Sequence, residues 1–118
     1  MNLIFLEYPK CSTCKKAKQW LDTNNISYVD RHVVENNPNE NELRDWIERS
    51  GLPIKRFFNT SGNLYKEYKL KDKLPLMNES EQITLLAAHG MLVKRPIIVG
   101  NDFVLVGFDE SKWERLKG

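Results

Sequence analysis

Two cysteines near the start of the chain have the spacing of a redox pair. Cys11 and Cys14 are three residues apart in the stretch EYPKCSTCKKAKQW. If the apolar run before them is a strand and a helix begins near Ser12, Cys11 lies at the helix N-cap or first position, where free backbone N–H groups and the helix dipole favour a thiolate. Such a cysteine commonly has its pKa lowered from about 8.5 to between about 3.5 and 7.5, and we expect Lys10 and Lys15 to add to the effect. The spacing therefore predicts a nucleophilic Cys11 and, one turn later, a more buried resolving Cys14.

Two other uses of these cysteines remain open. A zinc site needs four ligands, and besides carboxylates the chain offers only His32 and His89, neither at the spacing of a zinc finger or ribbon, so we expect no metal. Cys14 taken alone could be an inert core thiol, because it shares a helix face with apolar residues. Nothing in the packing pattern calls for a thiol at position 11.

A proline before an apolar strand, in LVKRPIIV, is the second informative feature. Proline suits the first residue of a strand. A cis Arg95–Pro96 bond would bring the arginine against the cysteine loop, where its guanidinium could hold an oxyanion or stabilise a thiolate. A surface arginine beside a trans proline is the alternative, since cis bonds are only about 5% of X–Pro bonds.

The composition is that of one soluble globular domain spanning residues 1–118, with 41% hydrophobic and 29% charged residues. A net charge of +2 does not indicate attraction to nucleic acid or to a membrane. The first apolar run is broken at Glu7 and is too short for a secretory signal or a membrane span, so we expect a cytoplasmic protein. Cysteines stay mostly reduced there, which favours redox, catalytic or metal chemistry over a structural disulfide.

The elements that must position these residues follow from hydrophobic periodicity and capping signals. We expect a βαβ unit, several helices, and then a hairpin with a final helix. The expected elements are a strand at 3–6, a helix from 12 to about 24, a strand within 26–34, a helix from Asn39 to Ser50–Gly51, short helices within 53–76, a helix from Asn78 to His89–Gly90, hairpin strands at 96–99 and 103–107, and a helix at about 109–116. Pairs at i,i+4 on the 39–50 helix, Glu40 with Arg44 and Asp45 with Arg49, indicate a solvated outer face.

The C-x-x-C motif, FFNTSG in the middle and HGMLVKRPI before the hairpin together resemble the arsenate reductase and Spx family of thioredoxin-like proteins. The resemblance runs from Met1 to the last helix and is strongest to small Gram-positive proteins labelled arsenate reductase-like. It implies an α/β, thioredoxin-like (glutaredoxin-like) fold, in which a mixed four-stranded sheet has a helical insertion between its βαβ and ββα halves. It also implies a catalytic Cys11 and an oxyanion-facing Arg95 before a cis Pro96. We add Ser12 and Thr13 as residues that shape the site.

The chain departs from this family at two positions. Members that reduce arsenate with glutaredoxin carry a single cysteine in the motif and two further arginines, where this sequence has Asn59 and Gly107. A tetrahedral dianion is best held by several forked guanidinium groups, so these losses argue against efficient arsenate capture. Lys55 or Arg56 could substitute only in part.

The sequence therefore predicts a monomeric, metal-free thiol–disulfide oxidoreductase with no bound cofactor. Its electrons would come from thioredoxin or a low-molecular-weight thiol. Weak arsenate reduction by the same cysteine attack is a second enzymatic possibility. The alternative from another class is an Spx-like redox-sensing transcription regulator, which would bind the RNA polymerase α subunit without contacting nucleic acid itself.

Overall fold

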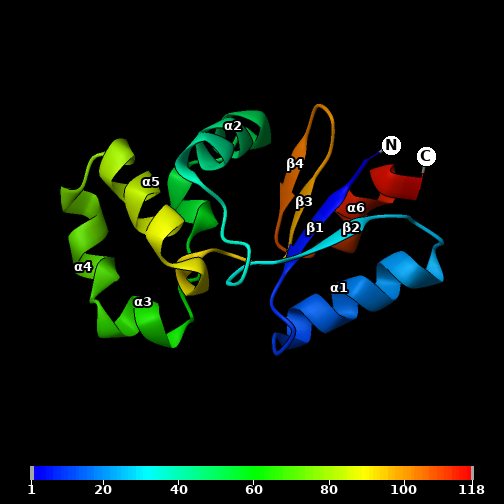
Figure 1. Cartoon of the computed structure of the whole chain (residues 1–118), viewed down its shortest axis with the longest axis horizontal. Helices are drawn as coiled ribbons and strands as arrows, with labels where there is room; N and C mark the ends of the chain where they lie inside the picture. Colours follow the sequence, from blue (N-terminus) through cyan, green and yellow to red (C-terminus); the bar gives the residue numbers. More distant parts are fainter. Residues whose placement is uncertain (1, 118) are drawn as a thin grey trace.

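A four-stranded sheet with helices on both faces organises the chain (Figure 1), and the computed structural model describes residues 2–117. In chain order the strands and helices are β1 (Ile4–Glu7), α1 (Ser12–Thr23), β2 (Val29–His32), α2 (Glu40–Ser50), α3 (Asn63–Glu67), α4 (Leu70–Lys73), α5 (Glu79–Ala88), β3 (Ile97–Val99), β4 (Val104–Val106) and α6 (Glu110–Trp113). Short 3-10 helices occupy Ile54–Phe57, Leu74–Leu76, Gly90–Leu92 and Glu114–Lys117. Within the described range, no helix is long and apolar enough to cross a membrane.

The strand order is β2-β1-β3-β4, with β1 and β2 parallel and the other two pairings antiparallel. The predicted mixed sheet is thus confirmed, as are the βαβ unit at its start and the hairpin of β3 and β4. Helices α2 to α5 form the expected insertion between these two halves.

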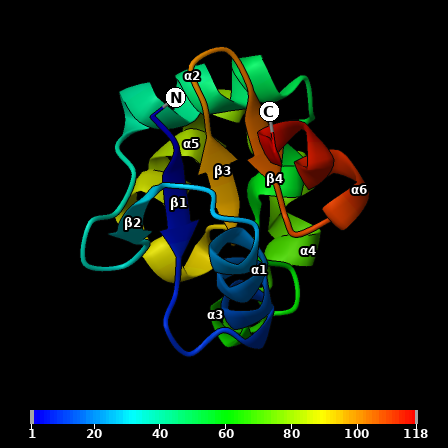
Figure 2. The same cartoon turned by 90° about the vertical axis from the view of Figure 1, so that its right-hand side faces the viewer.

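The strands are apolar on both faces because both faces are covered. Phe5 belongs to a buried cluster with Ala17 and Leu21 of α1 and Trp113 of α6. Its neighbour Leu6 points the other way, into a larger cluster that includes buried residues of α2 and α5. Figure 2 shows the two layers, with α1 and α6 in front of the sheet and α2 and α5 behind it.

Most helix boundaries predicted from the capping signals agree with the structure. Asn39 with Glu42 and Asn78 with Glu81 form complete capping boxes, and Gly51 ends α2 in the left-handed conformation with φ of 68°. The final helix is shorter than expected, because the α-helical part ends at Trp113 and continues as a 3-10 turn.

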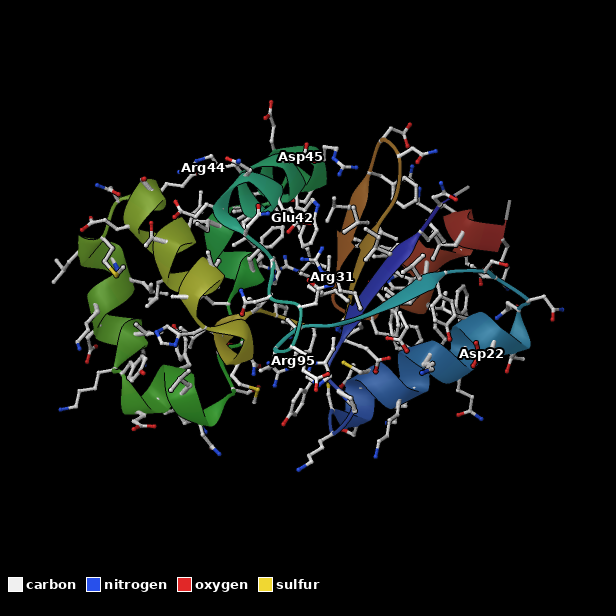
Figure 3. The ribbon with its side chains drawn as sticks, in the orientation of Figure 1. Asp22, Arg31, Glu42, Arg44, Asp45 and Arg95 are labelled. Atoms are coloured by element: carbon white, nitrogen blue, oxygen red, sulfur yellow. The ribbon has the colours of Figure 1, made fainter. Side chains whose placement is uncertain are left out.

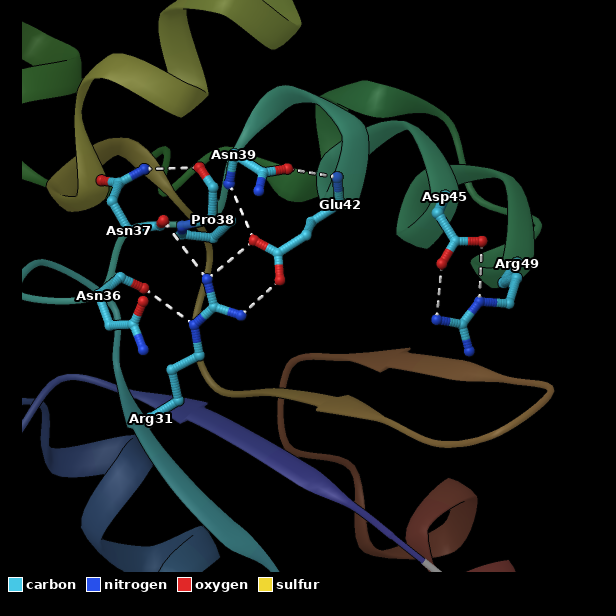
Figure 4. A network of polar contacts seen from close by, with 8 residues as sticks. All are labelled: Arg31, Asn36, Asn37, Pro38, Asn39, Glu42, Asp45 and Arg49. Atoms are coloured by element: carbon cyan, nitrogen blue, oxygen red, sulfur yellow. Dashed lines mark hydrogen bonds and ion pairs between the residues drawn. The ribbon is translucent and has the colours of Figure 1, made fainter.

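Arg31 connects the edge strand β2 to the insertion, and sequence reasoning did not predict this role. Its guanidinium donates to both carboxylate oxygens of Glu42, at 2.7 and 2.9 Å, and to the carbonyls of Asn36 and Asn37 (Figure 4). It also lies over the Trp46 ring, 5.6 Å from the centroid. Glu42 therefore serves both the helix cap and a partly buried ion pair between β2 and α2.

Candidate functional site

The strand-to-helix turn places Cys11 at the N-cap of α1, as predicted. The chain leaves β1 at Glu7, and the Cys11 N–H donates to the Tyr8 carbonyl at 3.0 Å, which closes the turn. The Cys11 backbone is extended, and its Sγ accepts the Cys14 backbone N–H at 3.4 Å. The cysteine sulfur takes the place of the usual serine or aspartate oxygen at a helix start, where partial positive charge favours an anion.

The two thiols have opposite acidities. Burial opposes ionisation of Cys11, but hydrogen bonds from the Cys14 thiol and backbone and the charge of Arg95 outweigh it and lower the Cys11 pKa. Cys14 is fully buried, and this burial, together with its hydrogen bond to Cys11, raises its pKa to about 12. Both are free thiols in this structure. Cys11 is thus the thiol that ionises first, with a protonated Cys14 directly beside it.

Arg95 lies against the cysteine turn, and the predicted cis bond to Pro96 is present. Its guanidinium donates to the carbonyls of Met91, at 3.0 Å, and Val93, at 3.3 Å. It also lies over the Tyr8 ring, 5.2 Å from the centroid. Figure 3 shows Arg95 between the insertion and the first turn of α1. This side chain is held in place by three groups and acts on Cys11 through its charge.

An open cavity of about 590 Å³ lies in front of Cys11. Its lining includes Ser12 and Thr13 of α1, Arg95, and, from the insertion, Asn59 and the segment 61–64. Pro96 does not line the cavity; it is buried, and its carbonyl accepts the Gly107 N–H at 2.8 Å. Of the predicted site residues, Cys11, Ser12, Thr13 and Arg95 line the cavity, whereas Cys14 and Pro96 are buried and do not.

The positions of the missing arginines are not equivalent. Asn59 lines the cavity, whereas Gly107 does not and has a left-handed backbone with φ of 80°. A Cβ on Gly107 would lie 3.8 Å from Cε of Lys94, which does line the cavity. Lys55 and Arg56 are exposed on the insertion and take no part in the lining.

The charged residues around Cys11 differ from the expectation. The charge that lowers the Cys11 pKa is that of Arg95, and neither Lys10 nor Lys15 is among its causes. Lys10 lines the Cys11 cavity, but Lys15 lines a separate depression next to Glu7. Side-chain direction accounts for Lys15, because successive residues of a helix point to different sides.

Glu7 is a titratable residue that sequence reasoning treated only as an interruption of an apolar run. Its side chain is 7% exposed and lies 3.5 Å from the Lys18 ammonium, which in turn contacts Asp30 at 2.8 Å. Burial and the adjacent Asp30 raise the Glu7 pKa to about 7, despite the nearby Lys18. A carboxylate in a strand that is covered on both faces is the sequence signal that could have indicated it.

No group of three or more histidine, cysteine, aspartate or glutamate side chains in residues 2–117 is arranged to hold a metal ion.

Comparison with known proteins identifies relatives along almost the whole chain. The model of the ArsC family matches residues 6–116. The uncharacterized protein YusI of Bacillus subtilis is 48% identical over 114 residues, 97% of each chain. The regulatory protein MgsR of the same organism is 28% identical over 115 residues, which cover 98% of this chain and 90% of that one.

Solved structures agree with the sequence relatives. The crystal structure of an ArsC family related protein from Bacteroides fragilis is 59% identical, has a TM-score of 0.96 and covers 98% of both chains. More distant matches include global transcriptional regulators named Spx and, for the fold alone, an arsenate reductase from Vibrio cholerae at 24% identity and a TM-score of 0.85. The fold is the thioredoxin-like one of this group, and its members carry names of both reductases and regulators.

Proposed function

The chain belongs to the ArsC family, and we propose that it is a thiol–disulfide oxidoreductase in which Cys11 attacks a substrate and Cys14 resolves the product. One observation carries the proposal: an acidic thiol at a helix N-cap faces an open cavity and accepts a hydrogen bond from the backbone N–H of a second, buried cysteine. A thiolate is the nucleophile in disulfide exchange, and a neighbouring thiol can displace a bound substrate.

The reaction begins when the Cys11 thiolate attacks one sulfur of a substrate disulfide. A mixed disulfide forms on Cys11, and the other substrate sulfur leaves as a thiolate. Cys11 has then lost its negative charge, so the Cys14 thiol no longer donates to a thiolate, and one of the causes of its high pKa disappears.

Cys14 next gives up its proton to solvent and attacks the Cys11 sulfur. The remaining substrate sulfur leaves as a thiolate, and a Cys11–Cys14 disulfide remains. The substrate has gained two electrons and the cysteine pair has lost two. Thioredoxin, or two equivalents of a low-molecular-weight thiol, would return them by the reverse exchange.

Disulfide exchange is also supported over arsenate reduction by the lining of the cavity. Asn59 contributes a neutral amide where a family arginine would contribute a forked cation, and Arg95 already donates to two carbonyls. A tetrahedral dianion therefore meets fewer free guanidinium donors than it needs. We expect arsenate turnover by the unmodified protein to be slow, and Asn59→Arg to increase it.

The names of MgsR and Spx favour a second candidate function, a redox-sensing transcription regulator. The same Cys11–Cys14 exchange would then report oxidation, and the partner would be the RNA polymerase α subunit. Both functions use the same cysteines, so turnover is what separates them.

The test measures NADPH oxidation with thioredoxin and thioredoxin reductase, using hydroxyethyl disulfide and arsenate as parallel substrates. Cys11→Ser should abolish disulfide turnover. The Cys14→Ser protein should still carry out the first attack by Cys11, and the mixed disulfide between Cys11 and the substrate should accumulate and be detected by mass spectrometry. Iodoacetamide should label Cys11 at lower pH than Cys14.

Labelling of Cys14 first would contradict the assigned roles. Absence of turnover, together with binding to the isolated RNA polymerase α subunit that changes between reduced and diamide-oxidised protein, would favour the regulator instead.

A further inference from the structure

Two neighbouring cations, Lys94 and Arg95, line the cavity in front of Cys11 but lie in different surroundings. Arg95 is occupied, because its guanidinium donates to two backbone carbonyls and lies over the Tyr8 ring. The Lys94 side chain is half-buried, and among the described residues it makes neither an ion pair nor a side-chain hydrogen bond. Lys94 therefore lines the cavity, and its ammonium group has no acceptor within residues 2–117.

The backbone holds Lys94 firmly in this place. Its N–H donates to the Phe57 carbonyl at 2.8 Å, and the preceding Val93 forms a bridge with Phe58, so this segment is tied to the insertion. Gly107 contributes no side chain beside Lys94, since even a Cβ there would remain 3.8 Å from the lysine Cε. The absent side chain at position 107 leaves room for the lysine.

On the basis of the proposed oxidoreductase function, we propose that Lys94 binds a carboxylate carried by the substrate, so that the site prefers disulfides with an anionic group close to the sulfur–sulfur bond. A lysine ammonium is a compact charge with three donors, which suits a single carboxylate better than a tetrahedral dianion. Arg95 remains the group that acts on the Cys11 thiolate.

The other groups of the cavity fit such a substrate. Lys10 is a third cation of the lining, and Glu67 is a carboxylate among the lining residues. Asn59, Ser61 and Asn63 supply neutral amide and hydroxyl groups, which can bond to carbonyl and amide parts of a small thiol compound. Among residues 2–117 the lining thus combines the Cys11 thiol with Arg95, which donates to two carbonyls, and with Lys94 and Lys10, which make no ion pair or side-chain hydrogen bond.

The covalent step is the first exchange described above. The Cys11 thiolate attacks a substrate sulfur, the mixed disulfide forms, and the other half leaves as a thiolate. Lys94 takes no proton or electron in this step. It holds the carboxylate of the substrate and so raises the rate of productive encounter.

Two aromatic disulfides of similar size, both giving coloured products, test the proposal. 5,5′-Dithiobis(2-nitrobenzoate) carries one carboxylate on each ring, whereas 2,2′-dithiodipyridine is neutral. The assay measures the second-order rate constant of each probe with reduced full-length protein carrying Cys14→Ser, so that only the Cys11 attack is followed. The variants are Lys94→Met, Lys94→Arg and, as a control, Lys73→Met on the exposed side of α4.

We expect Lys94→Met to lower the rate constant of the anionic probe about fivefold, the effect of one close charge in water, and to leave the neutral probe within about twofold. Lys94→Arg should keep the preference, and added salt should weaken it. Lys73→Met should behave like the parent protein. Because the Lys94 side chain makes no ion pair or side-chain hydrogen bond within residues 2–117, we expect nearly equal melting temperatures for all variants.

An equal loss with both probes, or no loss with either, would overturn the role of Lys94 while leaving Cys11 as the nucleophile. Failure of Cys11 to react with either probe in the protein with Lys94 intact would instead overturn the proposed function itself, and the Lys94 role with it.

Discussion

Glu7→Gln should remove a pH dependence that the buried carboxyl imposes on stability. In the folded protein the pKa of Glu7 is raised to about 7 from the ordinary value of 4.5, first by burial and then by Asp30. The folded state therefore binds the Glu7 proton more tightly than the unfolded chain does. By linkage, this contribution is fully present below about pH 4.5 and is lost as the pH rises through 7.

The size of the effect follows from the two pKa values. Between pH 5 and pH 8 the ionisation of Glu7 should lower the free energy of unfolding by about 2.5 kcal/mol. Neighbouring groups do not cancel it, because the pKa of Asp30 is lowered and that of Lys18 is raised, so both stay charged across this range. For a chain of this length the loss corresponds to roughly 10 °C in melting temperature.

The assay is urea unfolding of reduced wild-type and Glu7→Gln protein at pH 5 and pH 8. Cys11 also titrates, but it does so in both proteins, so the difference between their curves isolates Glu7. The advantage of Glu7→Gln should grow by about 2.5 kcal/mol from pH 5 to pH 8. Glu48→Gln, on the exposed face of α2, should show no such change. If the free energies of unfolding of wild type and Glu7→Gln change equally between pH 5 and pH 8, the assigned role of Glu7 is wrong.

Three further outcomes are expected. Arg95→Ala should raise the Cys11 pKa, because a cation that favours the thiolate is removed; iodoacetamide labelling across pH measures this, and an unchanged profile would contradict it. Arg31→Ala should lower the free energy of unfolding by about 1.5 to 3 kcal/mol, because it removes the charge-assisted hydrogen bonds between β2 and Glu42. Arg44→Ala, which breaks an exposed pair, should cost less than about 1 kcal/mol in the same urea titration. Gly107→Arg should destabilise the fold by about 1 kcal/mol or more, because a φ of 80° is strained for any residue with a Cβ; an unchanged melting temperature would argue that the hairpin end relaxes freely.

The elements of the fold could be predicted because their signals are local. In each capping box the asparagine at position 39 or 78 bonds to a glutamate three residues later, so both partners lie close together in the sequence. Gly51 can adopt the left-handed conformation that ends α2. Cys11 is the same kind of case, since the end of a strand and the start of a helix within ten residues are enough to place its sulfur on backbone donors. The short helices of the insertion were predicted less sharply, because they are broken by 3-10 turns that follow no clear period.

Other properties of the site were decided only by residues that are distant in the sequence. The sequence around Arg31 contains no signal for its ion pair with Glu42, because this pair depends on the packing of α2 beside the edge strand. The acidity of Cys11 depends on the nearby Cys14 and, in addition, on the charge of Arg95, which is 84 positions away in the chain.

The sequence by itself determined the elements and the cysteine at the helix start, because hydrophobic period, capping and chain direction act over a few residues. Only the tertiary structure decided that Glu7 is buried beside Lys18 and Asp30, that Arg95 donates to backbone carbonyls, and that Lys94 lines the cavity. The physical reason is that burial and charge depend on everything packed around a group, and the strand order brings those neighbours from segments far apart in the chain.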